Sequence, residues 1–168
     1  FSGLLDGGLP SDADDTALAV LALLKSGLPI SNDAIQNGLN WLITNQSDDG
    51  SWSTYIPGEG DVGCVSITAH AIEVLLEVNG YQKQIDQAVA WLETHISRDG
   101  FWDDLWLSKR TYGTACAINA IVKAGYHNIQ AIKDGVKWLE SVQNSDGGWG
   151  EDMFGNKIDS TVDLISKH

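Results

Sequence analysis

Apolar residues recur every three or four positions along most of this 168-residue chain, the spacing that gives an α-helix one buried face. No stretch alternates between apolar and polar residues in the manner of a half-buried strand. The pattern predicts helices at residues 14–26, 32–46, 65–79, 82–96, 111–124 and 129–143. We therefore expect an all-α protein.

The predicted helices belong to an internal repeat. The aligned segments are residues 38–52, 88–102 and 135–149. In each segment a Trp-Leu pair ends an apolar helical face, a turn containing Asp and Gly follows, and a second tryptophan closes the segment. The first tryptophans, Trp41, Trp91 and Trp138, are 50 and 47 residues apart. Another helix precedes each segment, so the repeating unit is a helical hairpin.

Three hairpins, at about 12–52, 65–102 and 111–149, make up one domain that covers residues 1–168. Stacked hairpins bury their apolar faces only against their neighbours, and a solenoid or a closed α/α toroid satisfies this need. Alanines crowd the first helix of each pair, which suits close contacts on an inner ring. We predict an α/α toroid of the α6/α6 barrel type, of which three hairpins form only part.

Composition narrows the choice of partners and compartment. With 43% apolar and 20% charged residues, the chain is typical of a globular domain. A net charge of −13 argues against nucleic acid or an anionic membrane surface as a partner chosen by charge, because both are polyanions. Cys64 and Cys116 are too few for a disulfide framework, so we expect a reducing, cytoplasmic location with both thiols packed in the interior. No apolar run is long enough to cross a membrane.

The candidate chemistry lies in three carboxylates, Asp12, Asp14 and Asp15, directly before the apolar run that begins at Leu18. One interpretation is structural, with an Asp N-cap and first-turn acids that answer the helix dipole. The other is chemical. Crowded carboxylates cannot all ionise cheaply, so one of them would retain a proton that it could donate.

The repeats and the aspartates together resemble the squalene-hopene cyclase family of class II terpene cyclases. Segments Gln46–Trp52 and Gln143–Trp149 are similar to the Gln…Trp repeats of that family, although Ile96 replaces the glutamine in the middle repeat. Residues 12–17 match its Asp-x-Asp-Asp-Thr-Ala motif. The resemblance covers nearly the whole chain.

This resemblance implies an enzyme that protonates a terminal alkene or epoxide of a polyprene and guides the carbocation through ring closures. By position in the motif, Asp14 is the acid, and Asp12 and Asp15 are its flanking carboxylates. The implied partner is a polyprenyl substrate. The resemblance implies no metal and no other cofactor, and it leaves peripheral membrane contact of the whole protein open.

Further candidate residues follow from the same resemblance. Thr68-Ala69-His70 matches a family sequence whose histidine hydrogen-bonds the acid, whereas an isolated histidine on an apolar face is more often a core residue. The aromatic residues that line the family's cavity match Tyr55, Trp106 and Tyr112. Aromatic faces can stabilise a cation without capturing it. Plain packing is the alternative role for these rings.

The chain also departs from the hopene-forming members of the family. Ser66 stands where the family often has a carboxylate, four residues before the histidine. Residues 1–10 and 107–111 do not follow the hopene-type pattern. The substrate could therefore be squalene or the prenyl diphosphate of a diterpene or sesquiterpene cyclase.

Two other classes of protein compete with this reading. Protein prenyltransferase β-subunits share the toroid and bind zinc, and Asp61, Cys64 and His70 could be zinc ligands, although their spacing is a poor fit. A non-catalytic helical-repeat module, or an inactive piece of a cyclase, is the other alternative. A partial toroid leaves apolar faces uncovered, so we also expect self-association, or incomplete order near residues 1–10 and 155–168.

Overall fold

The computed structural model describes residues 10–55, 62–106 and 109–151, which form helices joined by loops and contain no β-strand. The helices are α1 (Ala13–Lys25), α2 (Asp33–Thr44), α3 (Val65–Leu76), α4 (Gln82–Thr94), α5 (Lys109–Lys123) and α6 (Gln130–Val142). The all-α prediction is confirmed, and each expected helix is present with its ends moved by a few residues. The expected irregularity at the two ends falls, apart from Pro10, outside the described residues.

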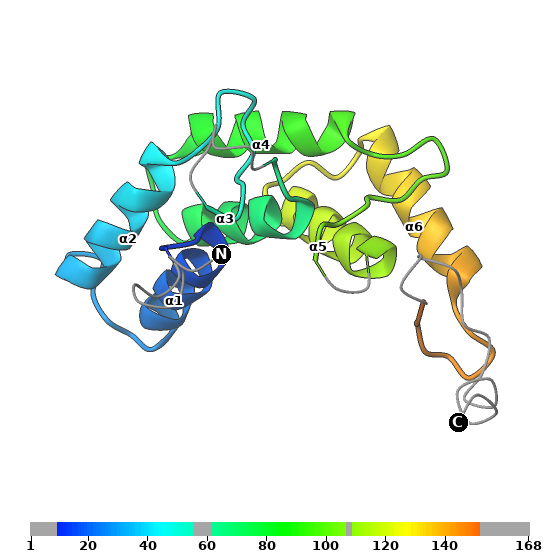
Figure 1. Ribbon diagram of the computed structural model, residues 1–168, viewed down its shortest axis with the longest axis horizontal. Helices are drawn as coiled ribbons and strands as arrows, with labels where there is room; N and C mark the ends of the chain where they lie inside the picture. Colours follow the sequence, from blue (N-terminus) through cyan, green and yellow to red (C-terminus); the bar gives the residue numbers. More distant parts are fainter. Residues whose placement is uncertain (1–9, 56–61, 107–108, 152–168) are drawn as a thin grey trace, which may run out of the picture.

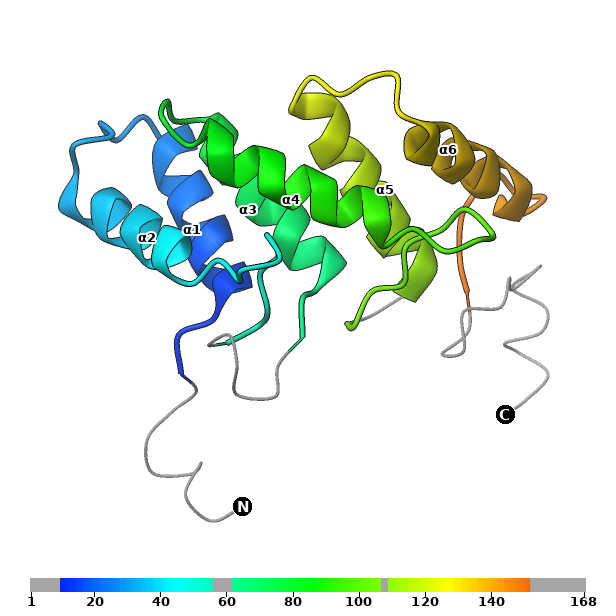
Figure 2. The ribbon, with the colours of Figure 1, turned by 90° about the horizontal axis from the view of Figure 1, so that it is seen from above.

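The helices form two curved layers, which together are an arc of an α/α toroid (Figure 1). Helix α3 lies between α1 and α5 in the inner layer and packs against both. Each outer helix packs on the inner helix that precedes it, α2 on α1, α4 on α3 and α6 on α5. Figure 2 shows that the first residues of α1, α3 and α5 lie along the same edge of the arc. Side chains in the first turns of α1, α3 and α5 can therefore contact one another.

A buried tryptophan closes each of the first two hairpins. The indole nitrogen of Trp52 donates to the Leu42 carbonyl near the end of α2 (2.8 Å), and Trp102 does the same to Leu92 near the end of α4 (2.7 Å). The last carbonyls of a helix have no partner within the helix, so each indole satisfies one of them. The third hairpin repeats the bond from Trp149 to Leu139 (2.9 Å).

The turn before each tryptophan reaches the next hairpin. The side-chain amide of Gln46 donates to Gly50 in its own turn (2.9 Å) and to Gln84 in α4 (3.0 Å). The first bond closes the turn, and the second joins neighbouring hairpins. Ile96, which replaces the glutamine in the middle repeat, packs half-buried against the core instead.

Two turn glycines are needed both for their backbone conformation and for space. Gly50 has a φ of +95°, and a Cβ there would lie 2.5 Å from the Gln87 carbonyl oxygen of α4. Gly100 stands in the same relation to Asp134 of α6, with a φ of +92°. Gly147 has a φ of +89°, but no described atom lies within 4 Å of the place for its Cβ. The third turn thus shares the conformation of the others without their contact.

We predict that Gly50→Ala destabilises the protein more than Gly147→Ala does. Both substitutions force an alanine into left-handed backbone, at about 1–2 kcal/mol. Only Gly50→Ala also pushes a methyl group into the next hairpin, which adds about 1–3 kcal/mol. Urea unfolding of the two variants measures the difference. Equal decreases in the free energy of unfolding of the two variants would show that the turn at Gly50 does not pack closely against α4.

Candidate functional site

The first turn of α1 gives its three aspartates different environments. Asp12 is the N-cap, and its Oδ1 accepts a hydrogen bond from the backbone N–H of Asp15 (2.7 Å). Its carbonyl accepts from the Thr16 hydroxyl (2.6 Å). The Asp15 side chain is exposed. The capping interpretation therefore holds for Asp12, and the carboxylates do not share one set of partners.

Asp14 differs from both because it contacts another helix. Its Oδ1 lies 2.6 Å from Nδ1 of His70, in the second turn of α3. The His70 side chain is 16% exposed, and that of Asp14 is 40% exposed. The structure thus joins two residues that are 56 positions apart in the chain, and it leaves the carboxylate of Asp14 accessible.

The contact changes the protonation of the imidazole. The hydrogen bond with Asp14 raises the pKa of His70 from 6.5 to about 10, with a further contribution from the nearby Cys116 and against the opposing effect of burial. At neutral pH the ring is therefore an imidazolium, and Nδ1 donates its proton to Asp14. The contact is therefore a charge-assisted hydrogen bond, which is stronger than one between neutral groups.

An aromatic residue on α5 completes this cluster. The ring of Tyr112 meets that of His70 edge to face, with centroids 6.4 Å apart and planes at 73°. Burial first, and then the neighbouring Cys116, Asp14 and Asp104, raise the pKa of Tyr112 to about 12, so the phenol stays neutral. Tyr112 is also 42% exposed, and part of its ring is open to a ligand.

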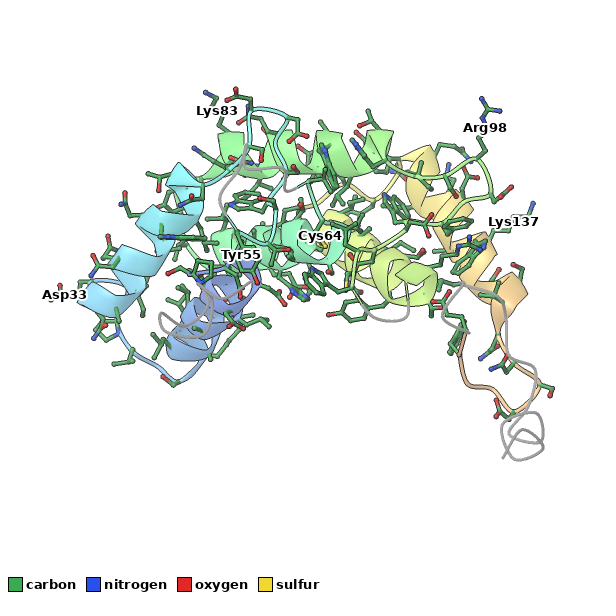
Figure 3. All side chains as sticks on the ribbon, viewed as in Figure 1. Asp33, Tyr55, Cys64, Lys83, Arg98 and Lys137 are labelled. Carbon is green, nitrogen blue, oxygen red and sulfur yellow. The ribbon has the colours of Figure 1, made fainter. Side chains whose placement is uncertain are left out.

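The other two aromatic candidates lie in the loops that precede α3 and α5. Trp106 is 51% exposed, and its indole nitrogen donates to the hydroxyl of Thr54 (3.2 Å). Tyr55 is half-buried and follows Thr54, whose carbonyl accepts from the backbone N–H of Ala13 at the start of α1 (2.8 Å). Figure 3 labels Tyr55 in this region. The two loops are therefore joined to each other through Thr54, and Thr54 joins them to the start of α1.

Asp12 and Asp15 line a different surface. Together with Thr16, Val20 and Gly38 they border a groove of about 410 Å³ between α1 and α2. The structure thus brings together Asp14, His70 and Tyr112 and does not place Asp12 and Asp15 with them.

Two residues near the site were missed by sequence reasoning. Cys116 follows Tyr112 by one helical turn on α5, so its helical spacing could have indicated it. Asp104 is a buried carboxylate whose partners lie 38 and 40 positions earlier, and nothing in the local sequence indicated it. Cys64 is buried, Cys116 is half-buried, and both are free thiols.

Two negative findings apply to residues 10–55, 62–106 and 109–151. In these ranges no group of three or more His, Cys, Asp or Glu residues is placed to hold a metal ion. No helix there is long and apolar enough to cross a membrane. Asp61, one of the zinc ligands considered from the sequence, lies outside these ranges, and the thiol of Cys64 donates to Asp104 (3.0 Å).

Comparison with known proteins assigns the family. Residues 59–163, more than half of the chain, match the model of the squalene-hopene cyclase C-terminal domain. The chain belongs to this family. The matched residues include His70, Trp106 and Tyr112, whereas the aspartates at 12–15 precede them.

The relatives of this chain include both squalene-hopene cyclases and copalyl diphosphate synthases. A squalene-hopene cyclase of Bradyrhizobium diazoefficiens is 30% identical over 88% of this chain and 26% of its own length. An ent-copalyl diphosphate synthase of a Streptomyces species is 32% identical over 85% of this chain and 27% of its own length. The chain thus spans about a quarter of the length of these relatives.

Solved structures show the same fold. The type II terpene cyclase MstE from Scytonema matches with a TM-score of 0.67 at 18% identity, over 88% of this chain and 45% of that one. Another structure of MstE, in complex with its substrate geranylgeranyl dihydroxybenzoate, matches with a TM-score of 0.66 at 17% identity, over 86% of this chain and 44% of that one. The family model and these structures confirm the predicted toroid.

We predict that the His70–Asp14 pair stabilises the fold in acid and neutral solution and stops doing so in alkali. The pKa of His70 is higher in the folded protein than in the unfolded chain, so its contribution is fully present below pH 6.5 and is lost as the pH rises through about 10. The measurement is urea unfolding of wild type and His70→Gln across this range. The advantage of wild type should shrink as the pH rises.

The exposed His127, in the loop between α5 and α6, supplies a control. His127→Gln should change the free energy of unfolding little at either end of the range. If wild type is more stable than His70→Gln by the same free energy of unfolding at every pH, the ion pair is contradicted.

Proposed function

We propose that the protein is a class II terpene cyclase in which Asp14 protonates a terminal alkene or epoxide of an isoprenoid chain. The observation that carries the proposal is the 2.6 Å hydrogen bond between His70 Nδ1 and Asp14 Oδ1. It couples an accessible carboxylate to an imidazolium at the edge where the inner helices begin. Membership of the squalene-hopene cyclase family supports the same reaction.

The chemistry is a transfer of one proton followed by movement of electron pairs. The accessible Asp14 carboxylate first takes up a proton from solvent at Oδ2; the substrate's π electrons then take that proton, which restores the carboxylate paired with His70 and leaves a carbocation on the substrate. The next double bond supplies the electrons that close a ring, and the charge moves on until a proton is lost. His70 stabilises the carboxylate on Asp14, and the faces of Tyr112 and Trp106 stabilise the cation without bonding to it.

The substrate is either squalene or a prenyl diphosphate. Identities of 30% to a squalene–hopene cyclase and 32% to an ent-copalyl diphosphate synthase support both about equally. Ser66, in place of the carboxylate that the family often has before its histidine, favours a member that departs from the hopene type. A non-catalytic module is the alternative, and the same assay tests it.

We predict that Asp14→Asn abolishes cyclisation in the whole protein and leaves the fold intact. The amide has nearly the shape of the acid but holds no acidic proton. The assay is product formation from squalene and from geranylgeranyl diphosphate, with and without a chelator. Whichever substrate turns over identifies the reaction. Turnover of neither would favour the non-catalytic module.

The matched control is Asp33→Asn, because Asp33 is an exposed aspartate in the first turn of α2. It should retain full activity. If Asp14 only complements the helix dipole from the first turn, Asp14→Asn will be as active as the control, since loss of that charge costs only about 0.3–1 kcal/mol. Activity that the chelator removes would overturn the metal-free mechanism.

We also propose that the chain self-associates through its third hairpin. Trp149 is 48% exposed, whereas Trp52 and Trp102 are fully buried, and no atom of the described residues lies within 4 Å of the place for a Gly147 Cβ. Light scattering should show particles larger than a monomer, and Trp149→Ser should reduce them. A monomer at all concentrations would contradict this.

For the whole protein we propose a cytoplasmic location with peripheral membrane contact, because an isoprenoid substrate partitions into lipid. Fractionation of cells would test it. Recovery in neither the cytosolic nor the salt-extractable membrane fraction would overturn it.

A further inference from the structure

A buried carboxylate holds the start of α3, the helix that carries His70. Asp104 is 4% exposed and accepts three hydrogen bonds. Its Oδ1 accepts from the backbone N–H of Ser66 (3.0 Å) and from the thiol of Cys64 (3.0 Å), and its Oδ2 accepts from the hydroxyl of Ser66 (3.0 Å). We infer that Asp104 is a positioning residue, which keeps His70 against Asp14 by capping α3. The inference rests on the proposed function of that pair.

Helix α3 depends on this carboxylate because it has no side-chain cap of its own. Cys64 occupies the N-cap position without a side-chain capping bond, whereas Asp12 caps α1 from within. The first backbone N–H groups of a helix need an outside acceptor, and a negative charge there is also favoured by the helix dipole. Ser66 lies one helical turn before His70 on the same face. Movement of the first turn therefore moves the histidine.

The cap is part of the repeat. In each hairpin, the residue two positions after the second tryptophan accepts hydrogen bonds from the start of the inner helix of that same hairpin. These residues are Thr54, bound to Ala13; Asp104, bound to Ser66; and Glu151, bound to Arg110 and Thr111. In the first hairpin the acceptor is a backbone carbonyl, and in the other two it is a carboxylate. The recurrence shows that the fold itself brings this position to the helix start.

The loop that carries Asp104 also reaches the other member of the pair. Trp106 donates to the hydroxyl of Thr54 (3.2 Å), and the carbonyl of Thr54 accepts from Ala13 (2.8 Å), the residue before Asp14. One loop therefore contacts the start of α3 directly and the start of α1 through Thr54. Loss of the Asp104 carboxylate would free α3 from this loop and leave the link to α1 in place. The distance between His70 and Asp14 should then increase.

The test is an NMR titration of the His70 ring in this chain. Asp104→Ala leaves Ser66 without its acceptor, so the pKa of His70 should fall from about 10 towards 6.5, by about one unit or more. Asp104→Asn should restore most of the wild-type value. Its amide oxygen can accept from the Ser66 N–H, and its amide nitrogen can donate to the Ser66 hydroxyl.

The control is Asp103→Ala, which removes the neighbouring aspartate, 62% exposed and paired with Arg110 (3.3 Å). It should leave the titration of His70 unchanged. A folded Asp104→Ala variant, checked by circular dichroism, with an unchanged His70 titration would overturn the inference.

If Asp104→Ala does not fold, Ser66→Ala provides the test, because it removes only the hydrogen bond from the Ser66 hydroxyl to Asp104. It should lower the pKa of His70 by a smaller amount, and no change would again overturn the inference. The titration needs neither substrate nor turnover. Failure of the proposed cyclase activity would therefore be seen separately, in the product assay.

Discussion

The hydrogen bonds of the repeat tryptophans hold the arc together, and the other features depend on them. The indole of Trp52 binds the end of its own outer helix, while its backbone N–H donates to the hydroxyl of Thr68 in the next inner helix (3.0 Å). Trp102 repeats the arrangement with Leu92 and Thr114. Each residue thus joins two hairpins through two hydrogen bonds, which pair four polar groups. This fixes how far each inner helix is displaced from the one before.

The alignment of the inner helices then creates the candidate site. Their N-terminal ends lie along one edge, where Asp14, His70 and Tyr112 project from three different helices. Helix starts favour negative charge, so an aspartate there is stable as a carboxylate. The imidazolium of His70 pairs with the carboxylate of Asp14, so this helix start carries a candidate acid–base pair as well as a cap. In a chain with a net charge of −13, such a partly buried cation is a local exception to the overall field.

The three hairpins are similar in backbone but differ in what they place at the equivalent positions. The residue two positions after the second tryptophan is Thr54 in the first hairpin and a carboxylate, Asp104 or Glu151, in the others. In the first hairpin α1 supplies its own cap, Asp12, and its loop contributes only a carbonyl. A repeat of this kind allows equivalent helix starts to carry different side chains, with the candidate acid in the first hairpin and His70 and Tyr112 in the next two.

The sequence by itself determined the helices, the repeat and the family, because helical periodicity and a motif of adjacent residues are local properties. It also indicated Asp14 and His70, through a resemblance that already contained their relationship. Only the tertiary structure separated Asp14 from Asp12 and Asp15, since three neighbours on one helical turn point in different directions and only one meets α3. Asp104 was found only in the structure for a related reason: its partners, Cys64 and Ser66, lie 40 and 38 positions earlier in the chain. The curvature of the packed helices, which no local pattern encodes, decides which distant residues touch.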